Sequence, residues 1–385
     1  MDEFADIRPY RDEEVPEVVA RLAADPQFAA TLARLRHPWL ARFALPLLVP
    51  LARRVVARRL EGVRTVHDLQ MLVGVYLERM LAETGTDFSV SGIEHLERDQ
   101  TYLFVSNHRD IAMDPAFVDL ALHRHGFDTV RIAIGDNLLT VPWAADLMRL
   151  NKSFVVPRSA SGRREKLAAL QRLSRYIRKS ILEDRCHVWI AQREGRAKDG
   201  VDRTDTAVIK MLGLARQRGE SFAEAIDRLH LVPVAISYMW DPCDLDKARE
   251  LHIRRQTGTY RKKPDEDLRS IYKGITGRKG AVHVAFGTRI AGLADDEAVA
   301  AEIDRQIAAR YRLHPSNLLA WERLYGADPR LASLKAEFAG DWREIEAELE
   351  RRAAGEEDAV RRILLAMYAN PVSARLALAE GAAVG

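Results

Sequence analysis

Cysteine is scarce in this sequence of 385 residues, which contains only Cys186 and Cys243. Two cysteines this far apart argue against a disulfide framework or a zinc site and favour a reducing compartment. The acidic, polar segment 1–14 lacks the features of a secretory signal peptide, so we expect a cytoplasmic protein. The net charge is only +3, which argues against a chain that binds nucleic acid over its whole surface.

Long hydrophobic runs are also missing. The longest, residues 43–52, has ten residues and includes two prolines, whereas a membrane-spanning helix needs about 20. Basic side chains flank this run, with Glu61 as the only acid: Arg42, Arg53, Arg54, Arg58, Arg59 and Arg64. Segment 42–64 therefore suits an anionic membrane surface, such as the inner face of the cytoplasmic membrane. A buried helical hairpin with solvated arginines explains the pattern equally well.

Several common catalytic motifs are absent. No G-x-S-x-G segment is present, which disfavours a serine hydrolase. The glycine-rich segment 274–280 matches neither a phosphate-binding Walker loop nor a dinucleotide fingerprint. No group of His, Cys and carboxylate residues has a familiar metal-ligand spacing. We therefore expect neither a metal nor a bound cofactor.

The remaining composition, 47% hydrophobic and 30% charged, is that of a globular protein. Helical patterns fill residues 1–86 and 291–385, and short apolar runs alternate with helices over 87–290. This alternation predicts an α/β domain whose central, largely parallel mixed sheet is flanked by helices, with helical N- and C-terminal extensions. The predicted strands are 102–105, 130–134, 153–156, 187–191, 231–236 and 282–286, and the predicted helices between them are 115–124, 142–150, 163–182 and 206–216.

The segment 106–115 carries the clearest chemical signal. His108 lies in a polar turn between a predicted strand and a predicted helix, a position typical of a general base in α/β enzymes. Asp114 precedes Pro115, so we expect it to cap the helix and also to accept a hydrogen bond from the imidazole. Asp110 competes for that second role, and the residues alone do not separate the two.

Three further blocks follow along the chain. Segment 151–158 is a strand whose end delivers Arg158. Segment 189–200 is a strand followed by a glycine-containing basic loop, with Glu194, Gly195, Arg196 and Lys198. Such a loop can bring cationic side chains and backbone N–H groups onto a phosphate, although a charge-paired surface loop has the same composition. The pattern of segment 231–238 predicts a buried strand that ends in a polar turn.

In this order, the four blocks resemble the glycerolipid acyltransferase superfamily. Its N-H-x4-D signature is matched by Asn107, His108 and Asp114, and its glycine–arginine loop by Trp189-Ile190-Ala191 followed by Gly195 and Arg196. The likeness covers residues 87–290 and is greatest to the soluble, plastid-type glycerol-3-phosphate acyltransferases and their bacterial relatives. One departure is clear: five residues separate His108 from Asp114 here instead of four.

The resemblance implies a reaction and a role for each residue. His108 would take the proton of a glycerol hydroxyl, and Asp114 would orient the imidazole, with Asp110 as the alternative. The cationic side chains that would hold the acceptor phosphate are Arg158, Arg196 and Lys198. Neighbouring residues in the His108 turn and in the basic loop would support the site: Asn107, Arg109, Glu194 and Gly195. The acyl donor would be a thioester of acyl carrier protein or coenzyme A.

Three functions remain open at this point. The first is acylation of glycerol-3-phosphate in phospholipid biosynthesis. The second is acylation of 1-acylglycerol-3-phosphate or another lyso-lipid, which uses the same hydroxyl chemistry. The third is a non-catalytic protein that binds lipid or a membrane surface, which the displaced Asp114 and the arginine-flanked segment 42–64 would fit.

Overall fold

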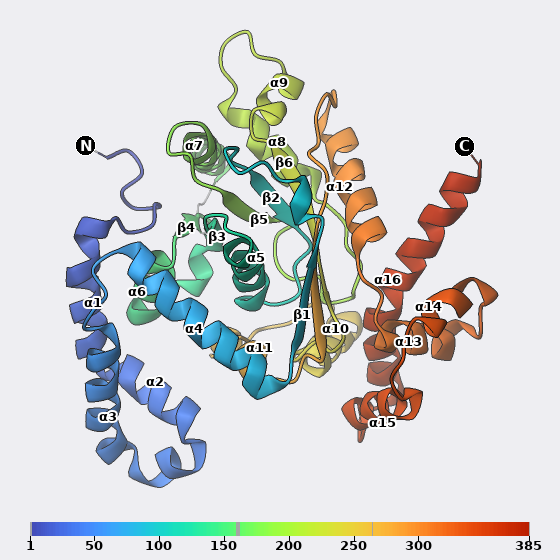
Figure 1. The fold of residues 1–385 in the computed structure, drawn as a ribbon, viewed down its shortest axis with the longest axis horizontal. Coiled ribbons are helices and arrows are strands. Elements are labelled where there is room, and N and C mark those ends of the chain that lie inside the picture. Colours follow the sequence, from blue (N-terminus) through green and yellow to red (C-terminus); the bar gives the residue numbers. More distant parts are fainter. Residues whose placement is uncertain (1, 159–161, 264, 385) are drawn as a thin grey trace. The chain divides into compact units, whose positions relative to one another are not determined.

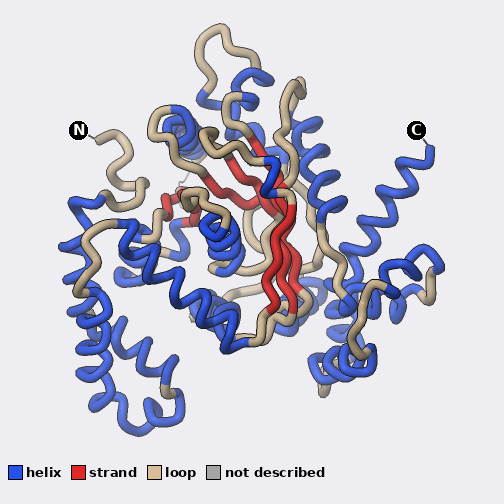
Figure 2. The backbone as a smooth tube through the Cα atoms, in the orientation of Figure 1, coloured by secondary structure: helices blue, strands red, loops and turns tan. Residues whose placement is uncertain are grey.

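The computed structural model describes residues 2–158, 162–263 and 265–384. The chain divides into two compact units, 1–79 with 130–177 and 80–129 with 178–385. The predicted boundaries at residues 86 and 290 follow the change of pattern in the sequence and remain a prediction. Figure 1 labels the elements, and Figure 2 shows the strands grouped among helices and loops.

The second unit contains five strands in the order β1-β7-β6-β2-β5. They are β1 (Asp87–Ser91), β2 (Leu103–Ser106), β5 (Val188–Ala191), β6 (Leu231–Tyr238) and β7 (Ala281–Phe286). The β1–β7, β6–β2 and β2–β5 pairs are parallel, and only β6–β7 is antiparallel. Every residue of β2 and β6 is buried, which explains why these strands are continuous apolar runs without polar alternation.

Helices complete the second unit. Helix α5 (Met113–Arg124) follows β2, and α8 (Thr206–Leu212) and α9 (Phe222–Asp227) follow β5. Between β6 and β7 lie α10 (Asp244–Thr257) and α11 (Glu266–Thr276), and after β7 the chain is helical. That last part consists of α12 (Asp296–Arg310), α13 (Pro315–Tyr325), α14 (Ala332–Ala336), α15 (Trp342–Ala353) and α16 (Asp358–Val384).

The first unit is mainly helical, with α1 (Val15–Ala24), α2 (Pro26–Arg36), α3 (Pro38–Leu60), most of α4 (Val66–Thr84), α6 (Pro142–Leu150) and most of α7 (Arg163–Leu182). It also holds the parallel pair β3 (Arg131–Gly135) and β4 (Ser153–Val156). Asp146 of α6 joins this unit together, because it accepts hydrogen bonds from Tyr10 at 2.7 Å and from Arg21 of α1 at 2.7 and 2.9 Å. Helix α3 packs against α2 as a hairpin and is kinked at Ala44, ahead of Pro46 and Pro50.

The predicted fold class is confirmed: the chain is an α/β protein with a largely parallel mixed sheet, flanking helices and helical ends. The six predicted strands and four predicted helices are all present, with ends shifted by a few residues or, for 206–216, a helix that stops at Leu212. Four strands or α-helices between residues 87 and 290 were not predicted: β1, the short helix α9, α10 and α11. Strand β1 is short and rich in Ser and Asp, and α10 and α11 occupy a charged segment in which no helix was predicted.

Candidate active site

His108 lies in the turn between β2 and α5, where a hydrogen bond fixes its ring. Its Nδ1 lies 2.8 Å from Asp114 Oδ2, and the imidazole side chain is 14% exposed. Nδ1 must donate to the carboxylate, so Nε2 is left as the basic nitrogen. Within the described part of the chain, Nε2 has no hydrogen-bond partner, which leaves it available to a bound hydroxyl. The ring also meets Trp189 edge-on, with 5.6 Å between the centroids.

Asp114 is fully buried and accepts four hydrogen bonds, so its position is strongly determined. Besides His108, Oδ2 accepts the backbone N–H groups of Arg109 at 2.5 Å and Asp110 at 2.9 Å, and Oδ1 accepts the Tyr238 hydroxyl at 2.5 Å. Burial alone would raise the pKa of Asp114, but the bond from His108 and the other donors outweigh it and hold that pKa below its ordinary value. Asp114 is therefore a carboxylate at neutral pH.

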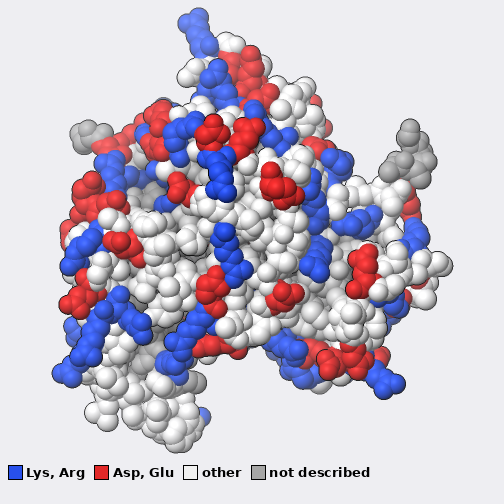
Figure 3. All heavy atoms as spheres, in the orientation of Figure 1, with Lys and Arg blue, Asp and Glu red and all other residues white. Residues whose placement is uncertain are grey.

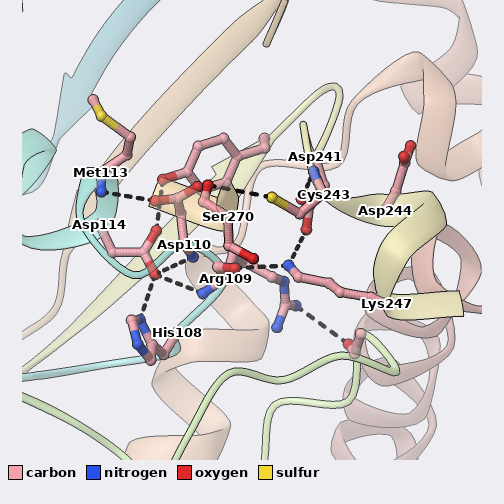
Figure 4. Close-up of polar contacts among 12 residues, drawn as sticks. His108, Arg109, Asp110, Met113, Asp114, Asp241, Cys243, Asp244, Lys247 and Ser270 are labelled. Carbon is pink, nitrogen blue, oxygen red and sulfur yellow. Dashed lines mark hydrogen bonds and ion pairs between the residues drawn. The ribbon is translucent and has the colours of Figure 1, made fainter. Parts of the chain in front are cut away.

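The expected capping role of Asp114 is wrong. Helix α5 begins at Met113, so Asp114 lies inside its first turn. Asp110 satisfies the helix start instead, because its Oδ1 accepts the N–H groups of Ala112 at 3.0 Å and Met113 at 2.9 Å. In this turn, Asp110 accepts from the N-terminus of α5 and Asp114 turns back to the imidazole (Figure 4).

Asp110 has a different electrostatic environment from Asp114. Burial and the neighbouring Asp114 charge raise the pKa of Asp110. Its Oδ2 lies against α11 so closely that a Cβ on Gly274 would come within 2.1 Å of it. Gly274 is therefore required for the close approach of α11 to this turn. The pKa of Asp110 is thus raised and the pKa of Asp114 is lowered. Asp114 is the carboxylate that contacts His108.

Asn107 and Arg109, the predicted supporting residues on either side of His108, are buried, and their side chains bind other parts of the fold. Asn107 joins β2 to β6, since its side chain accepts the Ile236 N–H at 2.8 Å and donates to the Ile236 carbonyl at 3.0 Å. Arg109 makes a two-pronged ion pair with Asp202 at 2.5 and 2.7 Å. These contacts fix both flanks of the turn without using the free nitrogen of His108.

The basic loop after β5 lies beside this turn, as expected for neighbouring parallel strands. The Gln192 N–H donates to the Ser106 carbonyl at 2.8 Å, and the Ala197 N–H donates to the His108 carbonyl at 2.7 Å. The C-terminal helix holds the far end of the loop. Gly200 has φ +77°, and a Cβ there would lie 2.0 Å from the Met367 carbonyl of α16.

The predicted phosphate ligands of the basic loop differ in whether their side chains form ion pairs. Lys198 forms an ion pair with the buried Glu250 of α10, and burial lowers the pKa of Lys198. Arg196 has no ion-pair partner among the described residues. Glu194 is exposed, and Gly195 makes the turn with φ +75°.

Arg158 belongs to the other compact unit and follows β4. Its backbone N–H donates to Asp136 Oδ2 at 3.1 Å, and its guanidinium donates to Asn137 Oδ1 at 3.3 Å. Within the second unit, the bond from the Ala197 N–H to the His108 carbonyl joins the loop of Arg196 and Lys198 to the turn of His108, whereas Arg158 belongs to the first unit.

Tyr238 is the site residue that the sequence analysis missed. Burial and the adjacent Asp114 raise its pKa well above the ordinary value, so it remains a neutral hydroxyl that donates to Asp114. The signal available in the sequence was its place at the end of the buried strand 231–238. Among the described residues, no group of three or more His, Cys, Asp or Glu side chains could hold a metal ion.

Comparison with known proteins agrees with the geometry. Residues 87–237 match the model of the acyltransferase family, a span that runs from β1 into β6 and includes both His108 and the basic loop. Over these residues, which make up less than half of the chain, the sequence is similar to the acyltransferase family. No curated protein matches in sequence.

Among solved structures, the chain is similar to the 1-acyl-sn-glycerophosphate (LPA) acyltransferase PlsC from Thermotoga maritima. The sequences are 13% identical, the TM-score is 0.38, and the match covers 74% of this chain and 89% of that one. A likeness of this size bears neither on the acceptor nor on the roles of individual residues. The predicted relation to the plastid-type enzymes remains a prediction.

Proposed function

We propose that this protein transfers a fatty acyl group from a thioester to the free hydroxyl of a glycerol phosphate in phospholipid biosynthesis. The observation that carries the proposal is the buried, ionised Asp114 on Nδ1 of His108, with Nε2 left free. This arrangement holds the imidazole in the tautomer of a general base and stabilises the imidazolium that forms during proton transfer.

The proposed reaction takes place in one transfer without a covalent enzyme intermediate. Nε2 of His108 removes the hydroxyl proton as the oxygen attacks the thioester carbonyl carbon. The C–O bond forms, the C–S bond breaks, and the imidazolium returns its proton to the leaving thiolate. The donor is a thioester of acyl carrier protein or coenzyme A, and no cofactor takes part.

Glycerol-3-phosphate is the first proposed acceptor, and we propose Arg196 as its main phosphate ligand. A guanidinium without a partner can form a two-pronged contact with phosphate oxygens. Lys198 has to share its charge with Glu250, so we assign it the smaller contribution. Arg158 remains proposed as a third ligand.

A second acceptor, 1-acylglycerol-3-phosphate, is favoured by an observation in the first unit. Helix α3 presents a large exposed apolar side chain at every fourth position on both sides of its kink at Ala44, a spacing that keeps successive side chains on the same side of a helix. Their exposed fractions are 72% for Trp39, 72% for Phe43, 78% for Leu47, 58% for Leu51 and 52% for Val55. We call these five residues the α3 apolar face; the buried hairpin considered above does not describe it.

We propose that the α3 apolar face binds an anionic membrane surface. Exposed arginines accompany it on the same segment: Arg42, Arg53, Arg54, Arg58, Arg59 and Arg64. Figure 3 shows the uncharged surface over the α2–α3 hairpin, with basic side chains along its edge. No helix among the described residues is long and apolar enough to cross a bilayer. An amphipathic helix in the interface would bring the enzyme to acceptors that reside in lipid.

The test is acyl transfer by the purified protein with glycerol-3-phosphate and 1-acylglycerol-3-phosphate offered in parallel, each with acyl carrier protein and coenzyme A thioesters. Turnover of glycerol-3-phosphate supports the first acceptor. Turnover of only the lipid acceptor replaces it with the second. A folded protein that acylates neither acceptor but binds vesicles would support the non-catalytic alternative.

A further inference from the structure

Lys247 of α10 is a buried lysine that contacts the turn of His108 from the side opposite to Asp114. Its side chain is 2% exposed, and its Nζ forms an ion pair with Asp241. The same Nζ donates a hydrogen bond to the backbone carbonyl of Arg109 at 2.6 Å (Figure 4). A charged group this deeply buried is costly unless both its charge and its hydrogen bonds are satisfied.

The peptide bond between Arg109 and Asp110 is held from both sides. Its carbonyl accepts from Lys247, and its N–H, that of Asp110, donates to Asp114 Oδ2 at 2.9 Å. These two contacts point in opposite directions, as they must for the C=O and N–H of a trans peptide. Rotation of this peptide would break both contacts together and remove one of the four donors that position Asp114.

We propose that Lys247 is a positioning residue that fixes the lengthened turn between His108 and Asp114 through the Arg109 carbonyl. A turn with five intervening residues has one more backbone carbonyl to satisfy than a turn with four. Without the Lys247 ammonium group, this buried carbonyl would lack its partner, and the peptide would gain by rotating toward water. The inference rests on the proposed role of the His108–Asp114 pair in acyl transfer.

A set of variants separates this role from general stabilisation. Lys247→Met removes the donor but leaves Asp241 buried and unpaired, so it also destabilises the fold. Lys247→Met combined with Asp241→Asn removes the unpaired charge. Asp241→Asn alone keeps the donor to Arg109. Arg178→Met serves as a control for the loss of a partly buried cation, because its ion pair with Glu220 does not touch the turn and Glu220 keeps Arg228 as a second partner.

We expect the Lys247→Met/Asp241→Asn protein to recover stability but to show a kcat lowered by roughly tenfold or more, with little change in KM, since the loss is in orientation and not in acceptor binding. Asp241→Asn and Arg178→Met should keep kcat near that of the wild type. A double variant with the kcat of the wild type, or an Asp241→Asn protein as impaired as the double variant, would overturn the proposal.

A spectroscopic measurement tests the inference independently of turnover. In protein with 15N-labelled histidine, the Nδ1 proton of His108 should give a downfield resonance, identified by its loss in His108→Ala. It should shift or broaden in the double variant and remain in Asp241→Asn. If the wild type acylates neither acceptor, the proposed function fails, and this resonance alone decides the role of Lys247: an unchanged signal in the double variant would refute it.

Discussion

The turn of His108 and the α3 apolar face differ in whether their side chains have partners within the protein. In the turn, Asp114 accepts four hydrogen bonds, Arg109 is paired with Asp202, and Lys247 holds a backbone carbonyl. On α3, aromatic and aliphatic side chains such as Trp39 and Leu47 are more than two-thirds exposed. In the first region these buried charges have partners among the described residues, whereas Nε2 of His108 has none.

The difference distinguishes a preorganised catalytic site from a surface that binds an external partner. A preorganised site keeps every polar group occupied except those that meet the substrate, because any spare freedom would cost orientation. A surface for an external partner has the reverse character, since its large apolar groups lose their contact with water only when the partner arrives. The predictions below test whether each region has the function that its pattern of contacts indicates.

The largest effect is expected for His108→Ala. Loss of a general base reduces transfer by about 100- to 10,000-fold, and Asp114 keeps three of its four donors, so we expect no large loss of stability. Steady-state kinetics with the preferred acceptor, together with urea unfolding, would measure both. Activity near that of the wild type would rule out His108 as the base.

The next largest effect is expected when the two aspartates of the turn are substituted one at a time. Asp114→Asn keeps the shape but replaces the ionised acceptor of the His108 Nδ1 proton, so kcat should fall by roughly 100-fold or more. Asp110→Asn should retain most of kcat and most of the stability, because an amide oxygen can accept the same two N–H groups at the start of α5. Equal losses of kcat in both variants would contradict the assignment of Asp114 as the orienting residue.

The His108 turn was predictable because its signals are local. A buried strand, a polar turn and Asp-Pro near the start of a helix lie within about a dozen residues, and the order of the later blocks follows from the sequence. The pattern could not decide between Asp110 and Asp114. That choice depends on where the extra residue places each carboxylate relative to the first turn of α5, and it led to the wrong helix cap.

The contacts between distant segments could not be predicted from the sequence. Tyr238 and Lys247 come from β6 and α10, more than 100 residues after the turn, and Gly274 matters only because α11 packs against Asp110. The pairing of Lys198 with Glu250 is a tertiary contact of the same kind. For α3, the basic flanks were visible in the sequence, but whether its apolar residues face a core or solvent depends on packing.

The α3 apolar face gives the next prediction. Trp39→Ser/Phe43→Ser should weaken binding to vesicles that contain anionic phosphatidylglycerol by about tenfold or more, since each ring contributes up to about 2 kcal/mol when it leaves water. Vesicle sedimentation measures this. Phe28→Ser is unsuitable as a control because Phe28 is buried, so Val75→Ser, an exposed position on α4, serves instead. Unchanged binding of the double variant would exclude α3 as the contact surface.

Arg196 and Lys198 test how the site holds phosphate. Arg196→Ala should raise the KM of the acceptor by about tenfold, the value of one charge-assisted contact. Lys198→Ala should raise it less, because Glu250 already shares the lysine charge and Arg254 compensates Glu250 at 2.9 Å. Acceptor titrations at constant donor concentration would compare the two. A larger effect at Lys198 would reverse their assigned importance.

His283 provides a contrast with His108, because both of its ring nitrogens are occupied. Nδ1 and Nε2 lie 2.8 and 2.9 Å from the hydroxyls of Ser89 and Ser91, and burial, with nearby Arg312, lowers the pKa of His283 to about 4. Below the ordinary pKa of about 6.5, the unfolded chain binds a proton that the folded chain refuses. Stability therefore falls as the pH drops from about 6.5 to about 4.

The contribution of His283 to this loss should be about 2 kcal/mol between pH 7 and pH 5. Urea unfolding of the wild type and of His283→Gln at both pH values measures it, and the pH dependence of the variant should be smaller by that amount. Its kcat at pH 7 should be unchanged, since no nitrogen of His283 is free to act as a base. A loss of kcat without a loss of stability would instead place a second functional histidine on β7.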